Sequence, residues 1–372
     1  MENKKNVSIL TLIISIAFLA YIIFCFKPLK TELQLTPEWS VALESIQKPE
    51  TESSAEPSST VRAAVPDLNV LPFKLGQNAG YFTHDGKISL LTNFEYKATI
   101  SKNYYSTFTQ NSPEVQIYNN KGEPIAKFFE GGFPYVTDDY LFLLLPGGSG
   151  FEIKEKNGLT LLRSEHPAPI TALQSHDLLT VAGYADGILR VFDSSLSEIF
   201  TLQPGGSDIE AILGANISSR GNFIACVSGQ NKQRFVLYKT EDNHAKVIFH
   251  KTLNNSIVCQ TLIKFSKDES TVYYNDSTGL GIVDCNKFTD KHIKIKGRIL
   301  DIQESPVSNS LFVLSKERHN NTNTYTLSII EQKSHKTGEF SFTAESAFIM
   351  TDENALFIGK DNKISKLIIS KE

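Results

Sequence analysis

The pair of side chains with the clearest chemical potential is His166 and Asp186, which flank a strand-like stretch of the chain. A carboxylate beside an imidazole can orient the ring and support general acid–base catalysis. The same two groups can instead hold a buried turn through a His–Asp hydrogen bond. We favour the structural interpretation, and the catalytic one stays open at this point.

Motifs for cofactors or for known catalytic groups are missing from the sequence. The chain has no GxxxxGK[ST] loop, no GxSxG and no HExxH. The Gly147–Gly150 run lies between two strand-like stretches, which predicts a hairpin loop instead of a nucleotide cradle. We therefore expect no catalytic residue, no cofactor and no metal site, and a protein that is not an enzyme.

Cysteines and acidic pairs have ordinary explanations. The four cysteines show no CxxC spacing, which favours small buried side chains over a zinc or redox site; they are Cys25, Cys226, Cys259 and Cys285. Three acidic pairs lie in expected turns, where they could bind calcium weakly or simply be solvated; they are Asp138-Asp139, Asp268-Glu269 and Asp352-Glu353.

The overall composition is that of a globular protein rich in strands. The chain has 372 residues, 41% of them hydrophobic, with 24 Phe, 13 Tyr and a formal net charge of −4. Aromatic and β-branched residues favour strands. A nucleic-acid-binding protein would show a basic face or a high pI, so we expect no nucleic-acid partner.

The N-terminus carries a long apolar stretch. Residues 7–26 include no charged side chain, and 20 apolar residues suffice to cross a bilayer as a helix. A cleavable signal peptide is the main alternative, but the exit of the stretch lacks small residues. We expect a cytoplasmic tail at 1–6, a transmembrane signal-anchor at 7–26, and a C-terminal domain outside the cytoplasm, on the periplasmic or extracellular side.

The next segment, residues 27–68, has the composition of a flexible tether. Its stretch Pro49–Thr60 is rich in Pro, Ser, Glu and Thr and has little to bury. One part differs: Thr36 followed by Pro37 is typical of a helix start. A helix at 36–47 would place Trp39, Leu43 and Ile46 on one face. We predict an amphipathic helix that lies on a surface or docks a partner.

Residues 69–372 repeat short apolar runs separated by Gly, Asp, Asn and Ser turns. The clearest unit begins at His166, and its strands are expected at Ile170–Leu173, Leu178–Gly183, Ile188–Phe192 and Glu198–Leu202. Four strands in ~40 residues make one propeller blade. The number of units predicts an all-β fold that consists of a single β-propeller with about seven blades. The last unit has only three expected strands, and an early strand such as Val70–Leu75 would complete it and close the ring.

The unit at His166 resembles a WD40 repeat. The resemblance rests on the segments HPAPITAL, LLTVAG and DGILRVFD, which begin at residues 166, 178 and 186. In that family a His, a Ser or Thr, an Asp and a Trp form one network within a blade. His166 and Asp186 match two of these positions, whereas Ala182 and Phe192 stand at the hydroxyl and Trp positions. The other units share only the rhythm and could equally resemble PQQ-type or YVTN-type propellers.

Two classes of function fit this expected architecture. The first is a membrane-anchored, non-enzymatic scaffold in the cell envelope, because a closed propeller presents loops for protein binding on a rigid ring. The second is a ligand-binding, hydrolytic or oxidoreductase propeller that uses its central channel, where residues of several blades can meet without a local motif. The identity of the protein partner is not encoded in any motif.

Overall fold

The fold is described from a computed structural model of the chain. It describes residues 15–18, 21, 33–43, 69–110, 113–176, 179–241, 244–253, 259–331 and 333–371. The expected cytoplasmic tail at 1–6 and most of the expected tether lie outside these residues, as do Cys25 and Ile46.

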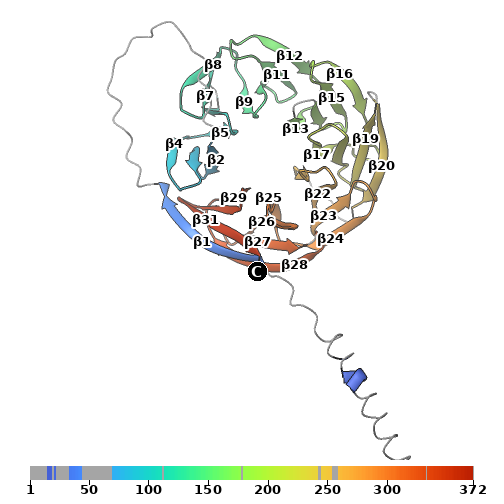
Figure 1. The fold of residues 1–372 in the computed structure, drawn as a ribbon. Helices are drawn as coiled ribbons and strands as arrows, with labels where there is room; N and C mark the ends of the chain where they lie inside the picture. The colour runs from blue at the N-terminus through green and yellow to red at the C-terminus, as the bar shows by residue number, and fades with distance from the viewer. Residues whose placement is uncertain are drawn as a thin grey trace, which may run out of the picture.

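Eight antiparallel sheets follow one another along the chain and form the blades of a propeller (Figure 1). The first strands line the centre of the ring: β2 Val70–Leu75, β5 Lys97–Ile100, β9 Phe133–Val136, β13 Ile170–His176, β17 Ile212–Ile217, β21 Ile263–Phe265, β25 Arg298–Glu304 and β29 Ala347–Asp352. The second strands are β3 Asn78–Thr83, β6 Tyr104–Phe108, β10 Leu141–Leu144, β14 Leu179–Tyr184, β18 Phe223–Ser228, β22 Thr271–Asp276, β26 Ser310–His319 and β30 Ala355–Lys360.

The outer half of each blade is built from the third and fourth strands. The third strands are β4 Ile88–Asn93, β7 Val115–Asn119, β11 Gly150–Lys154, β15 Leu189–Asp193, β19 Arg234–Glu241, β23 Gly279–Asp284, β27 Thr322–Glu331 and β31 Lys363–Lys371. The fourth strands are β8 Pro124–Phe128, β12 Thr160–Glu165, β16 Glu198–Leu202, β20 His244–Thr252, β24 Asp290–Lys294, β28 His335–Thr343 and β1 Leu33–Ala42.

The hydrophobic core lies between the blades. The blades are numbered from blade 1, which begins with β2, to blade 8, which begins with β29. Each pair of neighbouring blades shares at least one cluster of buried side chains; Val181 and Val191 of blade 4, for example, pack with Ile212 and Val236 of blade 5. The same arrangement joins blade 8 to blade 1, where Phe357 packs against Phe82. Because each blade buries both faces, its strands are apolar on both sides and show little alternation.

The prediction of an all-β propeller is confirmed, but the number of about seven blades is wrong. The described residues form eight blades. The difference arises at the start of the ring. The segments between Tyr81 and Phe129, which we interpreted as one irregular blade, form two blades together with Val70–Leu75, which we had assigned to the last blade. Over the described residues, blade 1 consists of β2, β3 and β4, so its repeat is short and merges with blade 2 in a count based on a 40-residue period.

The ring is closed by a strand that the sequence interpretation assigned to a helix. Residues 33–42 form β1, which pairs with β31 in blade 8, whereas Val70–Leu75 forms the first strand of blade 1. The helix predicted at 36–47 is therefore wrong over its described part, and the propeller begins before residue 69. The edge of β31 offers β1 a full set of backbone partners, which outweighs the local helix signal at Thr36-Pro37. Pro37 is accommodated at a register shift.

The predicted transmembrane helix at 7–26 is also corrected. No helix in the described residues is both long and apolar enough to cross a membrane. Of this stretch the structure describes residues 15–18 and Tyr21, which are helical. Crossing a bilayer as a helix takes ~20 residues.

Candidate functional site: a pocket in the channel wall

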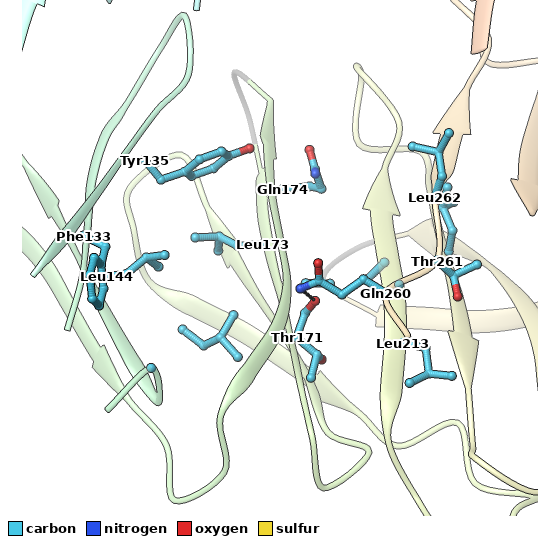
Figure 2. Close-up of a pocket in the computed structure, with 16 residues that line it drawn as sticks. Phe133, Tyr135, Leu144, Thr171, Leu173, Gln174, Leu213, Gln260, Thr261 and Leu262 are labelled. Carbon is cyan, nitrogen blue, oxygen red and sulfur yellow. Dashed lines mark hydrogen bonds between the residues drawn. The ribbon is translucent and has the colours of Figure 1, made fainter. Parts of the chain in front are cut away.

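A pocket of about 360 Å³ lies in the channel wall of blades 3 to 6. Its lining comes mainly from the first strands β9, β13 and β17 and from the residues at the start of β21, with Leu144 of β10 beside them, as Figure 2 shows. Apolar side chains form most of the lining; they include Phe133, Leu144, Ile170, Leu173, Leu213 and Leu262. Side chains from four consecutive blades therefore converge on one hollow.

The pocket is open because β13 does not bury its side chains. Six of its seven residues, Ser175 excepted, are only partly buried, whereas every residue of β17 is buried. A register shift between Ile170 and Ala172 interrupts the pairing of β13 with β14, as one between Ile212 and Gly214 does in β17. The partly exposed side chains of Ile170 and Leu173 are available to a ligand in the channel.

Two neighbouring loops hold the pocket in shape. The hairpin loop Gly147–Gly150, predicted from the sequence, joins β10 to β11, and the Gly148 carbonyl accepts a 2.8 Å hydrogen bond from the Ile170 N–H. On the other side, Gln260 donates from its Nε2 to the Thr171 carbonyl at 3.0 Å. The backbone of Thr261 then donates to the Leu213 carbonyl at 2.8 Å.

The polar groups of the pocket are uncharged. Gln174 and Gln260 supply amides, Thr171 and Thr261 supply hydroxyls, and Tyr135 supplies a phenol. Burial raises the pKa of Tyr135 above its usual value of 10.0, so its hydroxyl is neutral at physiological pH. The lining suits an uncharged, largely apolar group that also accepts or donates a few hydrogen bonds.

The predicted pair His166 and Asp186 meets, but outside this pocket. The His166 Nε2 lies 2.6 Å from Asp186 Oδ2, and the His166 ring packs 4.2 Å from that of Tyr184. Burial raises the pKa of Asp186, but hydrogen bonds from His166 and from the Ile188 N–H outweigh it and hold the pKa below 3.8. The pair joins the segment between β12 and β13 to the β14–β15 turn, which is consistent with a structural role.

Trp39 and Leu43, predicted on a docking helix, lie instead in the closure of the ring. The Trp39 Nε1 donates to the His84 carbonyl of blade 1 at 3.0 Å. The indole packs on Phe82 and Phe357 and covers Gly86, whose φ of +87° and lack of a side chain permit the contact. Leu43 is buried in the same cluster.

Sequence reasoning missed a second pocket, of about 480 Å³, at the junction of blades 8 and 1. His84 lies in it with its Nε2 2.9 Å from Asp352 Oδ2, and its Nδ1 lies 3.8 Å from Glu353 Oε2. Asp85 and Lys102 complete the charged lining. The acidic turn 352–353 was visible in the sequence, but nothing marked His84, since the two segments meet only when the ring closes.

The other acidic turns accept hydrogen bonds, from the neighbouring blade in one case and within the turn in the other. Asp138 accepts from the Lys102 N–H at 2.7 Å, and Asp268 accepts from the hydroxyls of Ser266 and Ser270. In the described ranges, no group of three or more His, Cys, Asp or Glu side chains is arranged to hold a metal ion.

The fold is an eight-bladed β-propeller with an uncharged, largely apolar pocket in its channel wall. A family model described as beta-propeller protein matches residues 1–371, and the chain belongs to that family. It is 26% identical over 353 residues to an uncharacterized protein of Treponema pallidum (strain Nichols), covering 95% of this chain and 91% of the relative.

Solved structures with a similar fold come from distant proteins. BamB from Moraxella catarrhalis has a TM-score of 0.57 at 11% identity and covers 90% of this chain and 100% of its own. Sqt1 of Saccharomyces cerevisiae has a TM-score of 0.59 at 11% identity and covers 82% of this chain and 93% of its own. A chain of the mitotic checkpoint complex has a TM-score of 0.54 at 13% identity and covers 92% of this chain and 94% of its own. At these identities the likeness concerns the fold.

Proposed function

We propose that this protein is a non-enzymatic interaction scaffold whose channel pocket binds an apolar segment of a protein partner. The observation that carries the proposal is the lining, which is partly exposed, largely apolar and free of carboxylates, imidazoles, amines and guanidinium groups. General acid–base catalysis needs a titratable group near the operating pH, so this lining supports binding better than chemistry. One neighbour in fold belongs to a multi-protein assembly, the mitotic checkpoint complex, which is in keeping with this role.

The experiment introduces one charge into the pocket. Leu173→Glu places a carboxylate among apolar side chains, where it repels an apolar ligand. Leu161→Glu is the matched control, because Leu161 lies on the outer strand β12 and is 46% exposed. Both variants are produced as full chains and checked for unchanged circular dichroism and thermal unfolding.

Crosslinking followed by affinity purification from the native cells then compares the variants with the wild type. We expect a specific protein that the wild type and Leu161→Glu recover and that Leu173→Glu loses at least about tenfold. Recovery of the same proteins by both variants would contradict binding at the channel pocket. Recovery of no specific protein by the wild type would contradict the scaffold role itself.

We further propose that the propeller works outside the cytoplasm, in the cell envelope. The support is the uncharged apolar stretch at 7–26, which has the character of segments recognised for export. Added protease should digest the protein in cells whose outer layers are permeabilised but whose cytoplasm is sealed. Protection until the cytoplasm is opened would refute this placement.

A further inference from the structure

Within the described residues, blade 1 has three strands, whereas each of the other seven blades has four. Its sheet has the order β2-β3-β4, and β4 is the outermost described strand of its blade in Figure 1. In each of the other blades an outer strand covers the third one. Among the described residues, the position beside β4 is therefore vacant.

The composition of β4 is unusual for a sheet edge. Natural edge strands are protected by charged side chains or proline, and each of the seven fourth strands carries at least one such residue. These strands read PIAKF, TLLRSE, EIFTL, HAKVIFHKT, DKHIK, HKTGEFSFT and LQLTPEWSVA. In contrast, β4 reads ISLLTN and has neither a charge nor a proline. Its sequence suits a strand that is paired on both sides.

The backbone groups that would accept a partner can be assigned. The Phe94 N–H donates to the Gln77 carbonyl at 3.0 Å, and Asn93 lies opposite Asn78. Because hydrogen bonding alternates along an antiparallel strand, Thr92 bonds to β3 while Leu91 and Asn93 direct their main-chain groups to the free edge.

The side chains of β4 hold this edge in place. Ile88 and Leu91 pack into the core between blades 8 and 1, and Leu90 packs into the core between blades 1 and 2. A hollow of about 510 Å³ at the Asn93 end of β4 is lined by Asn93, Phe94 and residues of the β2–β3 turn. The edge strand is therefore anchored in two cores and has open space at one end.

We propose that β4 binds an extended segment of a partner protein, which adds antiparallel to it as the fourth strand of blade 1. The seven existing fourth strands define the chemistry of this segment: five or more residues in which apolar side chains are interspersed with polar or charged ones. Main-chain hydrogen bonds supply the affinity and the interspersed side chains supply the selectivity, as in other strand-addition complexes. This surface is separate from the channel pocket and does not depend on it.

The probe is a synthetic peptide of residues 195–203, which contains the fourth strand of blade 4, and a scrambled peptide is its control. Hydrogen exchange on the full chain should show saturable protection of the Leu91 and Asn93 amides by the first peptide. The Thr92 amide, already bonded to β3, serves as the internal reference and should not change.

Two substitutions at one exposed position separate the main chain from the side chain. Asn93→Pro removes an outward N–H without touching the bonds to β3, since proline is tolerated at such edge positions. Asn93→Thr keeps the N–H. We expect Asn93→Pro to weaken peptide binding at least about tenfold and Asn93→Thr to leave it within about twofold, with equal thermal unfolding of the two variants. Leu173→Glu should not affect it.

Four outcomes would overturn the proposal. Equal protection by the scrambled peptide would show that the side-chain order does not select the strand, and protection by neither peptide would show that the edge does not accept a strand. Slow exchange of Leu91 and Asn93 in dilute protein alone would mean that the chain covers this edge itself. Protection that rises with protein concentration would mean that a second copy of the chain is the occupant.

Discussion

Replacing Trp39 with alanine should open the ring where blade 8 meets blade 1. This side chain is the only tryptophan in the protein, and it belongs to β1, the strand that completes blade 8. It joins that strand to blade 1 through the hydrogen bond to the His84 carbonyl and the contact with Phe82. Its loss therefore weakens the closure more than it weakens any single blade.

The expected magnitude follows from these contacts. Trp39 is partly buried, and burying ~100 Å² of its apolar surface contributes about 2.5 kcal/mol at 25 cal/mol per Å². The indole hydrogen bond adds about 1 kcal/mol. We therefore expect Trp39→Ala to lower the free energy of unfolding by about 2–4 kcal/mol, and Trp39→Phe, which keeps a ring but loses the donor, by about 1–2 kcal/mol.

Urea unfolding followed by circular dichroism measures both losses. Hydrogen exchange then locates them: amides of β31, which pair with β1, should exchange faster in Trp39→Ala than amides of β14 in blade 4. In the wild type, Trp39 emission reports the closure directly. A loss below about 1 kcal/mol, or equal acceleration in β31 and β14, would refute the role assigned to Trp39.

Other predictions concern single residues. A hydrogen bond from the Ser266 hydroxyl lowers the pKa of Asp268 from 3.8 to about 2. This carboxylate therefore contributes stability that is complete above pH 3.8 and lost as the pH falls toward 2. The free energy of unfolding of Asp268→Asn should depend less on pH in this range than that of the wild type. Burial raises the pKa of the Cys226 thiol to about 12, whereas Cys259 is exposed. Iodoacetamide at pH 8 should therefore label Cys259 in the native protein and Cys226 only after unfolding. Mass spectrometry of digests measures both labels. A Cβ on Gly214 would lie 2.3 Å from the Thr261 carbonyl oxygen, in the segment that leads into β21. Gly214→Ala should therefore lower the free energy of unfolding by about 1–3 kcal/mol. An unchanged urea midpoint would contradict this packing.

The sequence was most informative where its repeat was regular. The unit from His166 to Leu202 was predicted with four strands, and the structure places β13 to β16 within a few residues of those positions. The His166–Asp186 contact was also predicted, because the two residues flank strands of one hairpin in a known kind of repeat. Strand periodicity and turn residues are local properties, so the sequence alone can carry them.

The channel pocket could not have been predicted in this way. Its lining residues, such as Tyr135, Leu173 and Gln260, come from different blades and are ordinary residues in ordinary strands. The first strands of neighbouring blades meet only around the closed ring, so no spacing along the chain marks them. The contact of His84 could not be predicted for the same reason, because its partner Asp352 lies in the last blade and meets it only in the closed ring.

The N-terminal part of the propeller shows how tertiary pairing overrides a local signal. Thr36-Pro37-Glu38-Trp39 is typical of a helix start, yet these residues form a strand. Their backbone pairs with the edge of β31, and Trp39 packs into the core between blades 8 and 1. What the sequence by itself determined was the all-β class, the repeated blade and the absence of a familiar catalytic motif. Only the tertiary structure decided the number of blades, the strand that closes the ring and the pocket in its channel, because each depends on contacts between residues far apart in the chain.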